Sequence, residues 1–578
     1  MPRAALVVWT LGAVATGLVV SARRLGDFDL PWHLAFGRLI ASTKSIPRVD
    51  DLAYTHRPIE YAEFVADLLL YGLMTLGGPL GLQILGGVLT MLVLWVLSIK
   101  LRSGPAGVLV TASAIAAAGA WFIVRPATLS FVLIAWTAVA LEIHRSSPRS
   151  RAGRATLASL VPVHLAWANL HGFVVIGVAM VVAYLLYRAA CAAVRGRLPR
   201  LLPTTDATDL RWTSGVAMGV LGASMVNLAG PKLLLGPLRA IPDVGRVTEW
   251  EPTSLGFLLH HEPVALVYAI LVVALLVLGR EPASKLRAPS AWDVGVAFLG
   301  LVLASSAVRL VAVAAILTAP MAARRLAGLL PSTPRAWLTS SLAPVLLALW
   351  MLMRPGTTFG VGFEPDHFPE PAVQFVRDHK VAGTMWNSSV YGGYLSWRLY
   401  PEHRVLIDGR TGWVHEPRVV GLASQSEREP DAFRTLDGEF DFQWALCRAF
   451  EGEVFGLPLA ADAAWTMVFW DDVSAIYVRR DGVNHDLAAS GYRLVRHLTP
   501  LSAVVDLAVR GERVADLGHD AGLATDQAPA SARAAFLMAC AAIARRDATG
   551  YARAMQRLRE LSPSIGPVEV LERAWSGT

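Results

Sequence analysis

Residues 80–99 read LGLQILGGVLTMLVLWVLSI, an apolar run without a charged side chain. An α-helix of about 20 residues is long enough to cross the hydrocarbon core of a bilayer. We therefore predict that this run spans a membrane. Over the whole chain of 578 residues, 54% are hydrophobic and only 17% are charged, with a mean hydropathy of +0.47. This composition excludes an ordinary soluble protein and indicates a polytopic α-helical membrane protein.

Comparable apolar windows recur along the chain until about residue 354. We predict about eleven transmembrane helices, near residues 4–22, 80–99, 105–124, 127–143, 155–171, 173–190, 213–230, 263–279, 291–304, 306–322 and 338–353. A weaker amphipathic segment at 62–76 is expected to lie along the membrane interface. We interpret the first run as a membrane helix rather than a cleavable signal peptide, because Arg23 and Arg24 follow it directly.

The basic residues are concentrated in alternate loops between the predicted spans. With a cytoplasmic N-terminus, the inward loops contain Lys100, Arg102, Arg145, Arg149, Arg151, Arg154, Arg188, Arg195, Arg197, Arg200, Arg280, Lys285, Arg287, Arg324, Arg325 and Arg335. Cytoplasmic loops are enriched in Lys and Arg, so we predict this orientation in a bacterial inner membrane. An odd number of spans then leaves the C-terminal part extracytoplasmic. The same loops account for the net charge of +7, and we expect no nucleic acid partner.

Three regions follow from this pattern. They are a transmembrane domain at 1–354 with its first outer loop at about 23–79, an extracytoplasmic α/β domain at 355–510 and a C-terminal helical segment at 511–578. After Pro355 the chain alternates charged, aromatic and proline residues, as soluble domains do.

Short patterns predict elements inside the C-terminal part. A helix is expected to end near residues 375–379, and residues 404–410 predict a buried strand that ends in a turn. Two strands are expected at 465–469 and 473–478, and the apolar spacing over 531–561 predicts a helical hairpin of tetratricopeptide type.

The unusual polar residues of the membrane domain fall at the predicted outer ends of its helices. The first outer loop holds DFDLPWH at 27–33, and Glu63 follows later. The other outer turns and helix ends contribute Arg125, Asn169, His171, Glu249, Glu251 and Arg309. Ionisable groups are costly at membrane depth, so their concentration at one face predicts a functional site there.

Residues of the first outer loop also have structural explanations. Asp27 and Asp29 can cap the helix expected to start near Pro31, because Asp is favoured at that position and proline suits the first turn. His33 can be an interfacial residue beside Trp32, an aromatic anchor.

The remaining polar residues have structural explanations too. Arg125 can extend towards lipid phosphates. Asn169 and His171 can hydrogen-bond between helices, and Glu249 and Glu251 can lie in a solvated loop.

The outer segments resemble those of GT-C glycosyltransferases. Residues 27–34, DFDLPWHL, with Gly37, Ile40, Ile46-Pro47 and Glu63, are similar to the first outer loop of bacterial membrane proteins related to this superfamily. The superfamily includes protein mannosyltransferases and aminoarabinose transferases. Similar segments follow in the same order at 125–126, 167–172, 249–252, 386–395 and 407–410, so the resemblance covers most of residues 20–480.

The resemblance implies a reaction and its participants. In such enzymes a sugar moves, with inversion, from a polyprenyl-phosphate donor to a glycan, lipid or protein acceptor outside the membrane. An acidic residue of the first outer loop deprotonates the acceptor or helps to hold a divalent metal such as Mg²⁺ or Mn²⁺. This implies Asp27 as first and Asp29 as second candidate for base or metal ligand, with Glu63 as a further catalytic candidate.

The lipid phosphate that departs needs cationic or hydrogen-bonding partners. Arg125, His171 and Arg309 are candidates by their predicted topology. The other candidate substrate-binding residues are His33, Asn169, Glu249 and Glu251.

Two other functions fit a membrane protein of this kind. The first is a transporter or flippase for a lipid or polysaccharide, but transporters generally show internal repeats and polar groups near the midplane of the membrane. The second is a non-catalytic envelope assembly protein whose outer domain binds a partner, because a fold can persist without its activity.

Overall fold

The computed structural model describes residues 1–59, 63–100, 103–194, 207–235, 248–280, 289–410, 414–449, 454–561 and 565–576. The chain divides into two compact units. The first comprises Met1–Asp27, Ile40–Ile46 and Glu60–Gly362, and the second comprises Phe28–Leu39, Pro47–Ile59 and Phe363–Thr578. Most of the first half of the predicted outer loop thus belongs to the same unit as the C-terminal part of the chain. The loop residues Arg102, Arg195, Arg197, Arg200, Lys285 and Arg287 lie outside the described residues.

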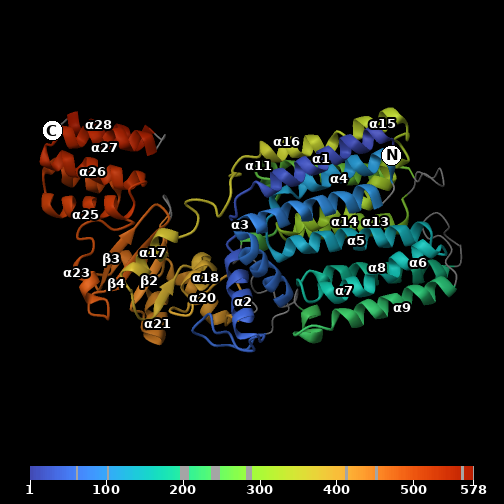
Figure 1. Cartoon of the computed structure of the whole chain (residues 1–578), viewed down its shortest axis with the longest axis horizontal. Coiled ribbons are helices and arrows are strands. Elements are labelled where there is room, and N and C mark those ends of the chain that lie inside the picture. The colour runs from blue at the N-terminus through green and yellow to red at the C-terminus, as the bar shows by residue number, and fades with distance from the viewer. Residues whose placement is uncertain are drawn as a thin grey trace. The chain divides into compact units, whose positions relative to one another are not determined.

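The first unit is built from helices (Figure 1). They are α1 (Arg3–Ser21), α3 (Phe64–Trp95), η1 (Val96–Lys100), α4 (Gly104–Ala117), η2 (Gly119–Trp121), α5 (Pro126–Ser146), α6 (Arg151–Ala158), α7 (Leu160–Trp167), α8 (Val174–Val194), α9 (Ala207–Ser224), η3 (Gly230–Leu235), η5 (Thr248–Trp250), α11 (Leu255–His260), α12 (Pro263–Leu278), α13 (Ala291–Ser306), α14 (Leu310–Ala327), α15 (Pro334–Ser340) and α16 (Ala343–Leu352). Helix α2 (Leu30–Thr43) contributes residues to both units.

Six of the described helical segments are long and apolar enough to cross a membrane. They are Arg3–Ser21, Phe64–Ser98, Pro126–Ser146, Val174–Val194, Leu310–Ala327 and Pro334–Leu352. Three shorter apolar helices, α4, α12 and α13, lie at further predicted spans. The protein is therefore a largely helical integral membrane protein, as predicted. The count of eleven transmembrane helices stays a prediction.

Helix α3 is interrupted near its middle. Gly78 has φ +59° and ψ −156°, outside the helical region, and Pro79 follows it. Glycine adopts a positive φ without a steric penalty, and proline lacks the N–H that a continuous helix would use. The break falls between the predicted interfacial segment at 62–76 and the predicted span at 80–99.

Helix α14 lies at the centre of the first unit. It packs against α4, α5, α12 and α13, and almost all of its residues are buried. Its sequence is rich in alanine, which lets neighbouring helices approach closely. Near its end, the buried Arg325 donates to the carbonyl oxygens of Leu275, Leu276 and Gly279 at 2.7–3.0 Å. The carbonyls of Leu276 and Gly279 at the end of α12 thereby gain a donor, and the Leu275 carbonyl, which also accepts from Gly279 N–H at 2.9 Å, gains a second one.

The second unit combines a sheet with helices. Its elements after α2 are α17 (Glu370–Asp378), β1 (Met385–Asn387), η6 (Ser389–Tyr391), α18 (Gly392–Leu399), α20 (Pro417–Ser426), α21 (Pro430–Phe440), β2 (Trp444–Arg448), α22 (Leu457–Ala461), β3 (Trp465–Trp470), β4 (Ser474–Arg479), α23 (His485–Ala489), α24 (Leu501–Arg510), α25 (Val514–Gln527), α26 (Ala532–Arg545), α27 (Ala548–Leu561) and α28 (Ile565–Ser576). The strand order is β1-β2-β4-β3, with β1 parallel to β2 and the other pairs antiparallel.

Both faces of this sheet are buried. Side chains alternate across a strand, so Trp386 and Tyr477 enter one hydrophobic core while Trp444 and Ile476 enter the other. Strands β3 and β4 confirm the two strands predicted around Asp471. Helices α26 and α27 likewise occupy the predicted hairpin, and α26 also packs against α25.

The strand predicted at 404–410 is wrong. Val405 makes an isolated bridge with Ala53. The backbone of the residues that follow hydrogen-bonds to a side chain instead of to another strand. The Asn387 carboxamide accepts from Leu406 N–H at 2.8 Å and donates to the Ile407 carbonyl at 2.9 Å. The Asn387 side chain thus satisfies the hydrogen-bonding groups of this buried backbone. The apolar sequence of the segment alone does not distinguish this arrangement from a β-strand.

Candidate functional site

Arg125 is the centre of a buried polar cluster in the first unit. It directly precedes α5, where Pro126 takes the first helical position. Its Nη1 donates to both carboxylate oxygens of Glu249, at 2.9 and 3.1 Å, and its Nε lies 3.6 Å from Asp27 Oδ2. The side chains of Arg125 and Asp27 are only 5% and 7% exposed. One buried arginine therefore joins two of the predicted acidic residues, the buried Asp27 and the partly exposed Glu249.

Glu249 also lies beside a second arginine. Arg309 Nη1 is 3.8 Å from Glu249 Oε2, and the Arg309 guanidinium lies over the Trp250 ring, 4.5 Å from its centroid. Burial alone would raise the pKa of Glu249, but the charges of Arg125 and Arg309 outweigh it and hold this pKa below its ordinary value. Glu249 is therefore an ionised partner shared by two arginines. The alternative prediction, that Glu249 only lies in a solvated loop, does not account for these contacts.

His171 belongs to a chain of hydrogen bonds at the start of α8. Trp167 Nε1 donates to Ser130 Oγ at 2.8 Å, and this hydroxyl lies 3.0 Å from His171 Nδ1. His171 Nδ1 also accepts from Phe173 N–H at 3.2 Å. Because Nδ1 is an acceptor in this arrangement, the neutral ring carries its proton on Nε2.

The protonation state of His171 follows from its surroundings. Burial, followed by the charges of Arg309 and Arg125, holds the pKa of His171 well below its ordinary value. Its Nε2 lies 3.7 Å from Glu63 Oε1, which also accepts from Gly172 N–H at 3.1 Å. The neutral His171 ring, a weak hydrogen-bond donor, thus lies beside the Glu63 carboxylate, which can act as a base.

Two predicted residues have other contacts. Asn169 donates to the carbonyl oxygens of Leu165 and Val226, at 3.0 and 2.9 Å, as the helix-linking alternative expects. Glu251 accepts from Val308 N–H through its backbone carbonyl, and its side chain is exposed. This backbone bond helps to hold the Glu249 turn against the start of α14, where Arg309 N–H donates to the Glu249 carbonyl at 3.2 Å.

Asp29 and His33 belong to the second unit. Asp29 directly precedes α2, and its carboxylate accepts from Trp32 Nε1 at 3.2 Å. A Cβ atom at Gly409 would collide with Asp29 Oδ1, so this turn approaches the carboxylate closely. The buried ring of His33 packs on that of Trp32, with centroids 3.4 Å apart.

The turn that carries Gly409 is held by buried charges. Arg410 donates to Asp408 and to Asp50 Oδ1, the latter at 2.9 Å, and His415 Nε2 lies 2.9 Å from Asp408 Oδ1. All four side chains are buried. Opposite charges at this depth hold one arrangement of the turn, because loss of Arg410 would leave two buried carboxylates without this cation.

In the part of the chain that the structure describes, the acidic residues do not form a recognisable metal site. Within the ranges that the structure describes, no group of three or more His, Cys, Asp or Glu side chains has the arrangement of metal ligands. Asp27 faces the cation of Arg125, and Asp29 accepts from an indole N–H. A guanidinium beside a carboxylate disfavours a bound divalent cation, so we derive no step through Mg²⁺ or Mn²⁺.

Sequence reasoning missed three residues of these networks. Ser130 supports His171, while Asp50 and His415 hold the Gly409 turn. A hydroxyl inside an apolar membrane helix is a usable signal for Ser130. Asp50 gives no such signal, because it lies in an ordinary polar loop 360 residues from Arg410.

No family model and no curated protein sequence matches the chain. The apo oligosaccharyltransferase from Archaeoglobus fulgidus is 10% identical over 83% of this chain and 75% of its own, with a TM-score of 0.51. Oligosaccharyltransferase AglB from the same organism, solved with an inhibitory peptide and a dolichol-phosphate, is 10% identical over 77% and 69%, with a TM-score of 0.49.

A third solved structure is less similar. The mycobacterial arabinofuranosyltransferase AftD is 15% identical over 83% of this chain and 41% of its own, with a TM-score of 0.45. The comparison with the apo oligosaccharyltransferase, at a TM-score of 0.51 and 10% identity, shows a common fold and no particular activity. The chain shares the fold of this archaeal oligosaccharyltransferase, which agrees with the resemblance of its sequence to GT-C glycosyltransferases.

Proposed function

We propose that this protein is an integral membrane glycosyltransferase that moves a sugar from a polyprenyl-phosphate donor to a glycan, lipid or protein acceptor outside the cytoplasm. The observation that carries the proposal is the buried cluster in which Arg125 and Arg309 share Glu249 beside Asp27. This cluster combines cations for a phosphate with a carboxylate for a proton. The GT-C fold supports the same reaction class.

The orientation of the helices supports an extracytoplasmic site. Arg125, His171 and Arg309 precede the first residues of α5, α8 and α14. The basic residues Arg145 and Arg324 lie near the opposite ends of α5 and α14. Under the positive-inside rule those opposite ends face the cytoplasm of a bacterial inner membrane, so the cluster and the second unit lie outside.

The two arginines suit a phosphate ester. Arginine presents several N–H donors in a fixed plane, and a phosphate accepts them as a carboxylate does. In this structure the Glu249 carboxylate takes that position between Arg125 and Arg309. We infer that the donor phosphate displaces Glu249 from one or both arginines when it binds.

Asp27 is the proposed general base. An acceptor hydroxyl is a weak nucleophile at neutral pH, and a positioned carboxylate accepts its proton as the new bond forms. The acceptor oxygen attacks the anomeric carbon, the bond from that carbon to the phosphate oxygen breaks, and the polyprenyl phosphate leaves with the electron pair. Arg125 and Arg309 stabilise the negative charge of the leaving phosphate. Asp29 and Glu63 are the next candidates for the base.

The experiment compares Asp27→Asn, Asp29→Asn and Asp486→Asn with wild type. Purified protein in liposomes receives a polyprenyl-phosphate-linked sugar and an acceptor glycan, and product is measured by mass spectrometry. If Asp27 is the base, Asp27→Asn lowers turnover at least about a hundredfold at unchanged thermal stability. Asp486→Asn is the matched control, because its side chain is exposed and it is not a candidate site residue.

Two results would contradict this function. Near-wild-type turnover in Asp27→Asn would remove that residue from the reaction. Movement of the intact lipid-linked sugar across the liposome bilayer, without product from any donor, would instead identify a flippase.

A further inference from the structure

Arg309 lies against two aromatic rings in the first unit. Its guanidinium carbon is 4.5 Å from the centroid of the Trp250 ring and 5.2 Å from that of Phe173. Both distances fall within the roughly 6 Å over which a cation is attracted to the face of a ring. The Arg309 side chain is only 15% exposed, and Phe173 is buried. Removal from water strengthens such an attraction, so both rings restrain the guanidinium.

The Glu249 carboxylate holds Arg125 more closely than it holds Arg309. Arg125 donates to this carboxylate at 2.9 and 3.1 Å, whereas Arg309 Nη1 lies 3.8 Å from it, beyond the distance of a hydrogen bond. Arg125 has one ring contact as well, at 5.4 Å from the Trp121 centroid. An attraction to a ring face needs no anionic partner. The position of Arg309 therefore depends less on Glu249 than the position of Arg125 does.

The backbone ties Trp250 to the residue that its ring contacts. The carbonyl of Glu249, just before Trp250, accepts from Arg309 N–H at 3.2 Å. The carbonyl of Glu251, just after it, accepts from Val308 N–H at 3.0 Å. The Trp250 ring and the Arg309 side chain thus extend from two segments that are hydrogen-bonded to each other.

Phe173 is held by the hydrogen-bond chain of His171. Its N–H donates to His171 Nδ1 at 3.2 Å, and the His171 ring packs edge-to-face with the Phe173 ring, with centroids 4.5 Å apart. Ser130 Oγ lies 3.0 Å from the same nitrogen of His171. This buried chain therefore fixes the second ring that contacts Arg309.

We propose that Trp250 and Phe173 are positioning residues, which keep the Arg309 guanidinium in place for the donor phosphate when that phosphate displaces Glu249. The inference rests on the proposed function, in which Arg125 and Arg309 bind this phosphate. A side chain that is already ordered loses less conformational entropy when it binds a ligand. The two rings thereby increase the affinity for the phosphate through Arg309.

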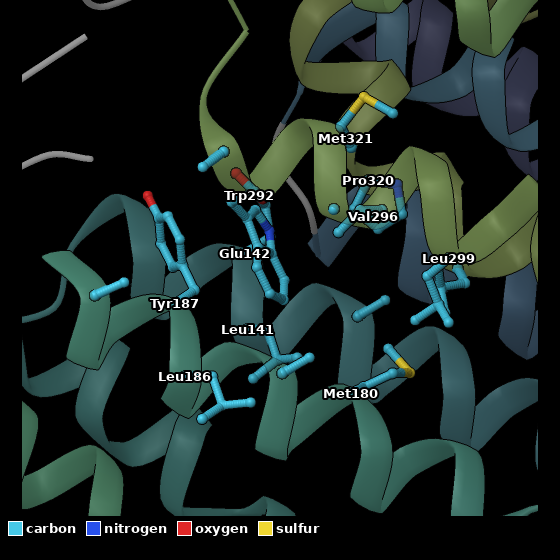
Figure 2. A pocket seen from close by; sticks show the side chains of 16 residues that line it. Leu141, Glu142, Met180, Leu186, Tyr187, Trp292, Val296, Leu299, Pro320 and Met321 are labelled. Atoms are coloured by element: carbon cyan, nitrogen blue, oxygen red, sulfur yellow. The ribbon is translucent and has the colours of Figure 1, made fainter. Parts of the chain in front are cut away.

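The first unit also contains an apolar cavity that can accept a polyprenyl chain. The cavity, of about 430 Å³, lies between α5, α8, α13 and α14 (Figure 2). Glu142, one of its lining residues, follows Arg125 by 17 residues, a rise of about 25 Å along an α-helix. Gly295 lines the cavity and is exposed, and a Cβ atom there would meet no atom within 4 Å. Gly295→Leu therefore narrows the cavity without a clash.

The experiment measures the affinity of the delipidated full-length protein for undecaprenyl phosphate by native mass spectrometry. Trp250→Leu should bind this probe about tenfold more weakly, the loss expected for one largely buried cation–π contact. Trp250→Phe keeps a ring face and should lose less, and it gives the same comparison if Trp250→Leu does not fold. Trp337→Leu on α15, which removes another half-buried indole, and Gly295→Leu should both bind like wild type.

Arg309→Gln separates a positioning role from a structural role. If the rings act through Arg309, Trp250→Leu and Phe173→Leu should weaken binding much less in the Arg309→Gln background than in wild type, because the group that they position is gone. Neutral undecaprenol, which has no phosphate, should bind equally well to all variants. Equal losses of undecaprenyl phosphate in both backgrounds would reduce the rings to a structural role, and wild-type affinity in Trp250→Leu would also overturn the proposal.

The remaining outcomes distinguish this inference from the proposed function. Loss of binding in Gly295→Leu, with none in Trp250→Leu, would place the lipid in the cavity and contradict the proposal. A wild type that does not bind undecaprenyl phosphate would overturn both the inference and the proposed donor. Binding in the expected order without any transfer of sugar would remove the proposed activity alone.

Discussion

The Arg125 guanidinium donates to both carboxylate oxygens of Glu249, although 124 residues separate the two in sequence. Arg125 is almost completely buried and Glu249 is one-third exposed. A charged pair at this depth is costly to break, because removal of one partner leaves the other charge without compensation. The pair therefore positions the start of α5 against the turn before α11.

The first prediction concerns the role of this pair in donor binding. Arg125→Gln should lower kcat/KM for the polyprenyl-phosphate donor about 10²–10³-fold, the usual effect of removing one electrostatic donor. Arg125→Lys should recover part of this loss, since it keeps the charge but not the planar fork. Glu249→Gln should lower the donor KM, because the competing carboxylate charge is gone. A change in thermal stability with an unchanged donor KM in all three variants would reduce the pair to a structural role.

The second prediction concerns Gly409. A methyl group there collides with Asp29 Oδ1, so Gly409→Ala should displace this carboxylate from Trp32 and cost about 1–3 kcal/mol of stability. Gly421→Ala on α20 is the control, because a Cβ there meets no atom within 4 Å. We expect this control to be neutral or slightly stabilising. Thermal unfolding of both variants decides the matter, and equal stability would contradict the close approach.

The third prediction is a pH dependence of stability that arises from Glu427. Burial raises the pKa of Glu427 to about 7, despite the hydrogen bond that Ser388 donates at 2.9 Å. The folded state therefore binds this proton more tightly than the unfolded state, whose glutamate titrates near its ordinary value. The contribution to stability is complete below that ordinary value and is lost as the pH rises towards about 7, at up to about 1.4 kcal/mol per pH unit.

Glu427→Gln tests this sign. The substitution should flatten the dependence of the melting temperature on pH between about 4.5 and 7, whereas Glu402→Gln at an exposed position should not. If Glu427→Gln keeps the slope of wild type, another group is responsible.

The fourth prediction tests the topology. In a background where Cys191, Cys447 and Cys540 are replaced by alanine, Arg149→Cys should be protected from a membrane-impermeant thiol reagent in intact cells. Pro430→Cys should be labelled after the outer membrane is made permeable. Both positions are exposed in the folded protein. Protection from the reagent would therefore show that the membrane, and not burial within the protein, blocks access. Labelling at position 149 with protection at position 430 would place the Arg125 cluster in the cytoplasm.

Sequence alone predicted the elements whose signal is local. A membrane helix is an apolar run of about 20 residues, so α1, α5, α8 and α14 were predicted close to their observed positions. Strands β3 and β4 and helices α26 and α27 also follow from the spacing of neighbouring side chains. The sequence further predicted most residues of the Arg125 cluster, because charged groups at the ends of membrane helices are rare and stand out.

Only the tertiary structure decided which of these residues meet. Asp27 joins Arg125 in the first unit, whereas Asp29, two residues later, lies at Gly409 in the second. The segment at 404–410 reads as a strand until Asn387 is seen to take its hydrogen bonds. Ion pairs and amide-to-backbone bonds join segments that are distant in the chain. Their geometry depends on how helices and turns pack, and no local periodicity encodes that packing.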